Sequence, residues 1–443
     1  MNLSLKKTII RIALIVIISQ SNISIAQENK FLSLQDAINL CIQNNKQLKL
    51  TLSKMESAKT SVKEATNNRL PDAGISGSYL LITKPKLSGP LVENTTPPNI
   101  HQAGFTMATA SLPLFSGFKI KNGIESAKYL EQAVKLDVEV DKDAIIQNTI
   151  EAYSNLYKAK SNVTVIKENL KQAALRTIDF QNLESKGIVA RNDLLRIQLQ
   201  ESNIELALLD AESNWKLANL NMNLMLGLEE NTRIEIDSNS FSLTEDNRTY
   251  ETYEQQAFTS RNEIAALQYR EKSALAGIRM AKADYYPSLK LTGGYFAAYV
   301  PSFITITNAW NGGIGLSYNI SSIWKTGAKV NSAKIALTDI KLRESILNDQ
   351  IKLEITQAFE RYIVSKEKIN VYAKALELAD ENNKITKNKY RNNLVTTTEL
   401  LDADVQHLQA ELNYTNSKAD ATVAYNKLKQ LTGTLSGTAT TSN

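Results

Sequence analysis

The sequence from Lys119 to Ser185 contains no proline and a single glycine: KIKNGIESAKYLEQAVKLDVEVDKDAIIQNTIEAYSNLYKAKSNVTVIKENLKQAALRTIDFQNLES. Proline and glycine are the residues that most often end or weaken a helix, so this run predicts one continuous helix. At about 1.5 Å per residue it would reach ~100 Å. The stretch from Lys325 to Asn392 has the same character. Helices of this length favour a coiled coil or a helical tube. The alternative is an ordinary buried helical bundle.

Each long helix is followed by a break and then by a second helical stretch. Lys186-Gly187 ends the first long helix and Asn392-Asn393 ends the second, because Gly and Asn tolerate the left-handed conformation found at helix ends. The helical pattern then resumes and stops before Gly227 and Gly433. We therefore predict two long helical hairpins, at residues 119–226 and 325–432.

The two hairpins belong to an internal repeat. A shift of 206 residues aligns Ser126-Ala127-Lys128 with Ser332-Ala333-Lys334, and no gap is needed over about 100 residues. Upstream the shift becomes 216, which places about ten extra residues of the first copy in a proline-rich loop at residues 83–101. The predicted organisation is a first repeat at 27–230, a linker at 231–250, a second repeat at 251–434 and a polar tail at 435–443. Each repeat is expected to open with a shorter helix, at about 34–68 and 253–283.

Each repeat also has a predicted strand pair before its long hairpin, at about residues 72–116 and 287–320. In the second pair, Leu289, Leu291 and Tyr295 share one face, and small or polar residues occupy the other. The same alternation starts again at Trp310. A soluble sandwich would show this pattern too, so it leaves both a sandwich and a membrane barrel open. Four strands are too few for a barrel of about eight or more, so a barrel would need several chains.

The first 26 residues have the features of a secretory signal peptide. A basic start precedes the aliphatic run Ile9–Ile18, and Ser24-Ile25-Ala26 supplies small residues for cleavage before Gln27. An uncleaved anchor is the alternative, although the apolar run is short for a membrane-spanning helix. The sequence thus predicts export from the cytoplasm.

Composition argues against several classes of function. Two His and one Cys provide neither a transition-metal cluster nor an intrachain disulfide. The 51 Lys and Arg nearly balance the 46 Asp and Glu, without the basic stripe of a nucleic-acid-binding protein. The sequence also lacks a phosphate-binding glycine loop and the common hydrolase motifs. We predict no enzyme, no cofactor, no metal site and no nucleic-acid partner.

The order and duplication of several motifs resemble the TolC-type outer-membrane efflux protein family, across essentially the whole mature chain. These motifs are Leu34-Gln35-Asp36-Ala37 with Asn44-Asn45, Leu70-Pro71, Leu112 to Gly117, Gly187 followed by Asp193-Leu194-Leu195, Tyr286-Pro287, and Asn393 to Leu401. The resemblance implies a mostly α fold with transmembrane β structure. In it, a trimeric 12-stranded outer-membrane β-barrel, with four strands per protomer, continues into a long periplasmic α-helical barrel.

The resemblance also implies a function and partners. Such a protein is the passive outer-membrane exit channel of a tripartite efflux or type I secretion system in a Gram-negative cell. It forms a homotrimer and receives substrates from an inner-membrane transporter through a periplasmic adaptor, a membrane fusion protein. A periplasmic coiled-coil scaffold without a pore is the alternative, because it shares the helices but does not need the alternating strands.

Finally, the resemblance assigns roles to residues near the helix turns. Glu399 and Asp402, three residues apart on one helical face, would form an acidic ring at the periplasmic entrance, where crowding of like charges raises pKa values and cations are favoured. Tyr390 and Asp193 would form a latch that holds the entrance closed, although Val395 stands where the family commonly has a basic latch residue. The alternatives are that both turns are simple helix breaks and, taken without the family, that the two acids form a solvated face. The adaptor contacts implied are Gly187, Ile188, Val189, Asn393, Leu394 and Val395, with Asn393 in place of the family's usual glycine.

Overall fold

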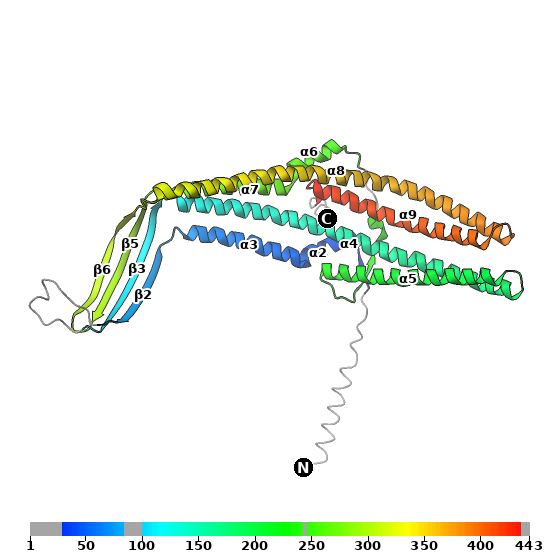
Figure 1. Cartoon of the computed structure of the whole chain (residues 1–443), viewed down its shortest axis with the longest axis horizontal. Helices are drawn as coiled ribbons and strands as arrows, with labels where there is room; N and C mark the ends of the chain where they lie inside the picture. The colour runs from blue at the N-terminus through cyan, green and yellow to red at the C-terminus, as the bar shows by residue number, and fades with distance from the viewer. Residues whose placement is uncertain (1–28, 84–99, 242–245, 436–443) are drawn as a thin grey trace, which may run out of the picture.

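The computed structural model describes residues 29–83, 100–241 and 246–435 as one elongated molecule (Figure 1). Long helices run side by side along most of its length, and a four-stranded sheet bends away from one end (Figure 1). The predicted signal peptide, most of the proline-rich loop and nearly all of the polar tail lie outside the described residues. Among the described residues, no helix has both the length and the apolar character needed to span a membrane.

Two helical hairpins form the longer part of the molecule. Helices α4 (Lys119–Ser185) and α5 (Arg191–Leu226) form the first, and α8 (Ser322–Arg391) and α9 (Thr397–Leu431) form the second. The first hairpin closes on a narrow seam of aliphatic residues with alanine between them. Such a seam brings two helices together along their length without forming a wide core. Its fully covered members are Ile166, Ala173, Ile204 and Ala211.

The shorter helices are each broken in two, whereas the sequence led us to expect one continuous helix in each repeat. Helix α2 (Leu34–Asn44) ends at Asn45, whose side-chain oxygen accepts a hydrogen bond from the Leu48 amide at 3.1 Å and starts α3 (Lys46–Asn67). In the second repeat, α6 (Tyr250–Ser260) and α7 (Asn262–Lys282) meet at Arg261. These breaks let α2 and α6 leave the helical wall, while α3 and α7 run along it to the sheet (Figure 1).

Each broken helix meets the end of a hairpin helix. Helix α5 ends at Gly227, in the left-handed conformation, and the Asn44 side chain donates a hydrogen bond to the Leu226 carbonyl at 2.9 Å. Helix α9 is followed by Gly433, where a side chain would meet the Ser260 carbonyl oxygen at 2.8 Å. Thus α3 continues the line of α5, and α7 that of α9, so the wall keeps its width along the molecule.

A further layer crosses the outside of the two hairpins at mid-length, and we call it the equatorial layer: α2, α6, η1 (Ser238–Phe241), β1 (Asn29–Leu32) and β4 (Arg233–Ile236). Strand β4 lies in the predicted linker and pairs in parallel with β1, which the sequence did not reveal. Tyr153 of α4 is fully buried beneath this layer and donates a hydrogen bond to the Leu32 carbonyl at 2.8 Å.

The linker is also held by a buried carboxylate. Asp246 pairs with Arg248 at 2.6 Å and accepts hydrogen bonds from the hydroxyls of Tyr253 at 2.7 Å and Tyr425 at 3.1 Å. The Arg248 guanidinium, with help from the two hydroxyls, holds the pKa of Asp246 far below its usual range. This cluster ties the segment between the repeats to α6 and α9.

The sheet is antiparallel and joins the two repeats. Its order is β2-β3-β5-β6, so β3 (Gln102–Ser116) pairs with β5 (Ser288–Val300), while β2 (Asp72–Leu81) and β6 (Ile304–Ser317) are unpaired edges. The pairing fixes which strand belongs next to which, and it leaves one free edge for each repeat.

One face of the sheet is apolar and uncovered. Tyr295 lies opposite Trp310, and Leu291 opposite Ile314, whereas Thr292 and its neighbours on the other face are small or polar. Trp310 is 78% exposed. A sandwich would cover this face with a second sheet, and within the described residues only one sheet of this size exists.

Gly117 joins β3 to α4 and provides a test of this junction. Its φ is +61°, and a Cβ there would overlap the Ala283 carbonyl oxygen. We expect Gly117→Ala to lower the free energy of unfolding by about 1–3 kcal/mol, because both the backbone conformation and the space exclude a side chain. Denaturant unfolding of the detergent-solubilised protein, followed by helical circular dichroism, measures this change.

The matched control is Gly277→Ala in α7, where no atom lies within 4 Å and the φ is ordinary. That change should leave stability unchanged or raise it by up to about 1 kcal/mol. Equal unfolding free energies for the two variants would contradict the role assigned to Gly117.

Candidate functional site

The two hairpin turns have the same backbone geometry. Gly187 has φ +71° and Asn393 has φ +58°, both left-handed. The amide that follows each residue reaches back five residues: Ile188 donates to the Leu183 carbonyl, and Leu394 donates to the Lys389 carbonyl, both at 2.9 Å. This is the Schellman motif, in which Asn is the usual substitute for Gly. Asn393 therefore replaces the glycine without changing the turn.

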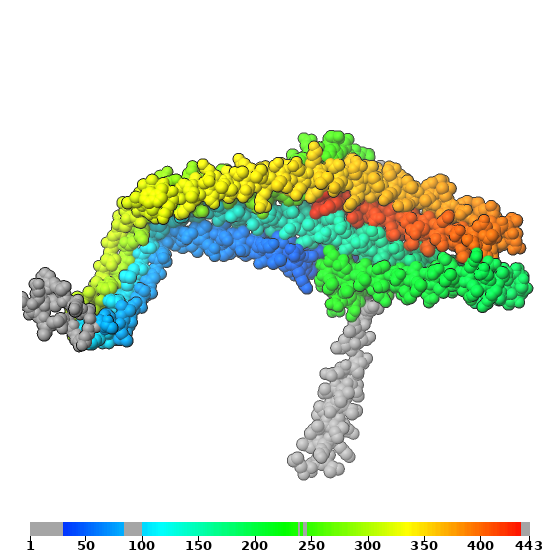
Figure 2. Space-filling view, in the orientation of Figure 1, coloured from blue at the N-terminus to red at the C-terminus, as the bar shows by residue number. Residues whose placement is uncertain are grey.

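Both turns present an apolar side chain to solvent. Ile188 is 61% exposed and Leu394 is 72% exposed, at the end of the molecule farthest from the sheet (Figures 1 and 2). In a Schellman motif the residue at this position often packs back on its own helix, which neither side chain does fully. By contrast, Val189 contacts the apolar cluster behind the first turn, and Val395 is half-buried. The exposed pair gives the tip two matching apolar contacts.

Behind the turns, an aromatic contact joins the two hairpins. Tyr390 of α8 stacks on Phe180 of α4 with 5.5 Å between ring centroids. Its hydroxyl lies 3.5 Å from the hydroxyl of Thr397, at the start of α9. Burial, aided by the negative charge of Asp193, raises the pKa of Tyr390. In this single chain Asp193 is thus a charged neighbour of Tyr390, whose hydrogen-bond partner is Thr397.

An ion-pair cluster, about one helical turn farther from the hairpin turns along α4 and α8, also joins the hairpins. Arg176 of α4 pairs with Asp404 of α9, and Lys387 of α8 lies 3.4 Å from the same carboxylate. The side chains of Arg176 and Asp404 are only 17% and 10% exposed. The sequence did not reveal this cluster, because only the packing of α4 against α9 brings together residues so far apart in the chain. The one available signal was a charge on an otherwise small or apolar helix face.

A third contact joins the two helices that follow the turns. Arg196 of α5 donates a hydrogen bond to the Thr398 hydroxyl of α9 at 2.7 Å. Three kinds of contact therefore hold the first hairpin against the second near their common end. We call this set the hairpin junction: Arg176, Phe180, Arg196, Lys387, Tyr390, Thr398 and Asp404.

Glu399 and Asp402 both lie exposed at the start of α9, on one face of the helix. Glu399 also has a structural role, because its carboxylate accepts hydrogen bonds from the Thr396 amide at 2.7 Å and from the Thr396 hydroxyl at 3.1 Å. These bonds, the amide first, lower the pKa of Glu399. The rise in pKa expected for an acidic ring depends on carboxylates from other copies, so it stays a prediction.

Comparison with solved structures identifies the fold. VceC of Vibrio cholerae is 17% identical with a TM-score of 0.72, and the match covers 90% of this chain and 96% of that one. CmeC of Campylobacter jejuni is 18% identical with a TM-score of 0.74, and covers 91% and 86%. MtrE of Neisseria gonorrhoeae, solved in an open state, is 16% identical with a TM-score of 0.71, and covers 91% and 89%. All three are described as outer-membrane proteins or channels. No curated protein sequence matches this chain.

A family model establishes the relationship in sequence. The model described as "Outer membrane efflux protein" matches residues 37–228 and 254–434, one match for each repeat and together most of the chain. The expected family, fold class and exit-channel function are confirmed. The chain therefore belongs to the outer membrane efflux protein family, and it is an outer-membrane efflux channel that extends into the periplasm.

Proposed function

We propose that three copies of this chain close into one continuous exit duct. Each copy contributes four strands. Two copies would give eight, a barrel whose interior side chains just fill, whereas three copies give twelve and a wider interior. The edge strands β2 and β6 leave backbone amides and carbonyls without ladder partners, which is unfavourable in lipid. Pairing β6 of one copy with β2 of the next removes every edge.

The helices support the same arrangement. Along α8, exposed apolar residues recur every seven positions at Val364, Val371, Leu378 and Ile385. Along α5, the exposed residues include Leu199 and Leu206. Because α5 and α8 form opposite edges of the helical wall (Figure 1), the two stripes meet when copies stand side by side.

The observation that carries the proposal is the uncovered apolar face of the sheet. Ile75, Trp310 and Leu316 are 84%, 78% and 72% exposed, far more apolar surface than a soluble scaffold leaves to water. Aromatic and aliphatic side chains on this face, with glycine and polar residues on the other, match a strand with lipid on one side and water on the other. A scaffold without a pore does not require such a face.

The duct would act with two partners and without catalysis. We expect the exposed tips at Ile188 and Leu394 to bind a periplasmic adaptor, which connects the duct to an inner-membrane transporter. The duct itself would be passive, and the inner-membrane transporter would supply the energy for export. Selection of the cargo belongs to that transporter rather than to the duct.

Membrane extraction and bilayer recordings test the duct against the scaffold. The duct should leave outer membranes only with detergent, elute as a trimer and form ion-conducting pores in planar bilayers. A monomer released by salt alone and unable to conduct ions would establish the scaffold and reject the duct.

The acidic ring predicts cation preference. Replacing Glu399 with Gln and Asp402 with Asn should lower cation preference, measured as reversal potential across a KCl gradient, because six carboxylates leave the entrance of the trimer. Gln is chosen over Ala because it can still accept the hydrogen bonds from Thr396. The control is Glu56→Gln with Glu64→Gln, which removes the same charge from exposed positions on α3. Unchanged selectivity in the entrance variant would reject this role.

The hairpin junction predicts the resting conductance. Asp404→Asn leaves Arg176 and Lys387 without their carboxylate, and breaking such a largely buried pair costs about 3–5 kcal/mol. The hairpins should separate more readily, and single-channel recordings should show a several-fold higher resting conductance. The latch variant Tyr390→Phe with Asp193→Ala should raise the resting conductance as well.

Glu377→Gln is the control for this experiment, because it breaks an exposed ion pair with Lys374 that lies within α8 alone. It should conduct like the parent. If Asp404→Asn also matches the parent, the junction does not restrain the entrance.

A further inference from the structure

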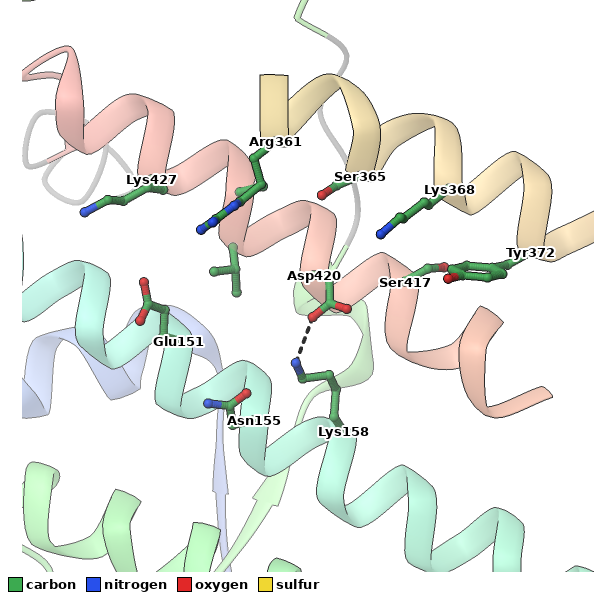
Figure 3. A pocket seen from close by; sticks show the side chains of 12 residues that line it. Glu151, Asn155, Lys158, Arg361, Ser365, Lys368, Tyr372, Ser417, Asp420 and Lys427 are labelled. Carbon is green, nitrogen blue, oxygen red and sulfur yellow. Dashed lines mark hydrogen bonds and ion pairs between the residues drawn. The ribbon is translucent and has the colours of Figure 1, made fainter. Parts of the chain in front are cut away.

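At mid-length, α4, α8 and α9 enclose a cavity of about 510 Å³ (Figure 3). Four cationic side chains and two carboxylates line it, which leaves two excess positive charges in each copy. The cations are Lys158, Arg361, Lys368 and Lys427. This volume falls within the range of about 300–1,000 Å³ typical of sites for small organic molecules.

The excess charge resides mainly on α8. Lys158 is neutralised by Asp420 at 2.7 Å, as Figure 3 shows. Across the part of the chain that the structure describes, no carboxylate lies within 4.0 Å of the charged nitrogens of Arg361 or Lys368. Both side chains extend from α8 toward the cavity (Figure 3). Their donors are therefore available to a ligand.

The first repeat lacks these charges. The 206-residue shift aligns Arg361, Lys368 and Lys427 with three asparagines, Asn155, Asn162 and Asn221. A cation at each of three aligned positions in one repeat, and an uncharged amide in the other, distinguishes this cavity from a generally solvated helix surface.

The cavity lies on the face opposite to the equatorial layer. In each of the three helices a tyrosine packs against that layer or its linker: Tyr153, Tyr362 and Tyr425. Lys158, Arg361 and Lys368 point the other way, into the cavity, whereas Lys427 at its rim donates a hydrogen bond to Gln430 of its own helix (Figure 3). The equatorial layer must lie outside the proposed duct, because three such layers would fill its bore. The cavity therefore faces the bore, a conclusion that rests on the proposed function.

The cavity is electrically independent of the entrance. From Asp402 to Asp420, α9 rises by 18 residues, or ~27 Å. The screening length at physiological ionic strength is about 8 Å. An acidic entrance does not cancel the positive potential at mid-length.

We propose that this cavity binds the oxyanion group of cargo in transit, namely a small organic carboxylate, phosphate or sulfate. Arg361 offers the planar donor pair that matches an oxyanion. Lys368 adds a second charge seven residues, or about two helical turns, farther along α8. Ser365 lies between them with a hydroxyl, and the half-buried ring of Tyr372 offers a surface for an apolar part of the molecule. The cavity stays open to the bore, so the ligand is released rather than trapped.

Calorimetric titration of the detergent-solubilised trimer with phenyl phosphate at low salt tests this site. The parent should bind it, with an affinity that falls as salt is added. Arg361→Gln with Lys368→Gln should weaken binding about tenfold or more, because two charge-assisted hydrogen bonds are lost. Lys368→Gln alone should have a smaller effect. Phenyltrimethylammonium, a cation of similar size, should not bind.

The control is Lys352→Gln with Lys366→Gln, which removes two charges from α8 at positions that do not line the cavity. It should bind like the parent. Circular dichroism and gel filtration of each variant verify that it folds and forms trimers. Absence of binding in the parent, or equal affinity in the cavity and control variants, would overturn the proposal.

Bilayer recordings on the same preparations separate this inference from the proposed duct. If the parent conducts ions but does not bind phenyl phosphate, the site is rejected and the duct stands. If it binds through Arg361 and Lys368 but does not conduct, the duct is rejected, and with it the assignment of the cavity to a bore.

Discussion

The unpaired edges of the sheet and its exposed apolar face constrain the arrangement of the rest of this molecule. Strands β2 and β6 expose backbone groups that no part of the described chain pairs, and Trp310, Ile314 and Leu316 expose apolar area that nothing covers. In water this surface favours aggregation, whereas in lipid the apolar face is satisfied and only the edges need partners. In the proposed trimer the neighbouring copies provide those partners, and the helices that continue the strands would then form a tube of matching width.

That requirement explains why the short helices break. A wall of four strands is continued by α3, α4, α7 and α8, and below the equator by α5, α4, α9 and α8. The exchange of α3 for α5, and of α7 for α9, occurs where Gly227 and Gly433 allow chain ends to approach closely. The segments freed by the breaks, α2 and α6, cover these joints from outside. The equatorial layer thus follows from the way each chain builds its wall: two helical hairpins are joined end to end with two shorter helices, and the layer covers the joints.

The sequence predicted the parts of this architecture that depend on local chemistry. The absence of proline revealed the long helices, the 206-residue shift revealed the repeat, and side-chain alternation revealed the strands of β5 and β6. The break at Asn45 had a local signal, because Asn44-Asn45 resembles the Asn392-Asn393 pair that ends the second long helix, although it was used only as a family motif. The break at Arg261 carries neither proline nor glycine. The pairing of β1 with β4 depends on contacts between residues about 200 positions apart, which local patterns do not encode.

The candidate site shows the same division between local and distant signals. The turn at Asn393 could be placed from the sequence because a left-handed residue acts locally. The capping box of Thr396 and Glu399 also has a local signature, a threonine followed three residues later by a glutamate. Glu399 therefore has a structural role in starting α9 besides its charge. The pairing of Arg176 with Asp404 needed the packing of two hairpins.

Divergence of the repeats gives the duct chemistry that a perfect duplication would not. In the proposed trimer, two identical repeats would place every charge at six positions around the bore. Because Arg361 and Lys368 align with Asn155 and Asn162, each copy has one cationic cavity of this kind, and the proposed trimer would have three. Near the hairpin turns, Asp402 aligns with Arg196, so the two repeats differ in charge there, and Arg196 donates a hydrogen bond across to Thr398. The repeats thus share a backbone that builds the helical wall, while their side chains differ: both repeats contribute to the contacts that hold the hairpins together, whereas the cations of the mid-length cavity that lack a carboxylate partner within the described chain belong to the second repeat.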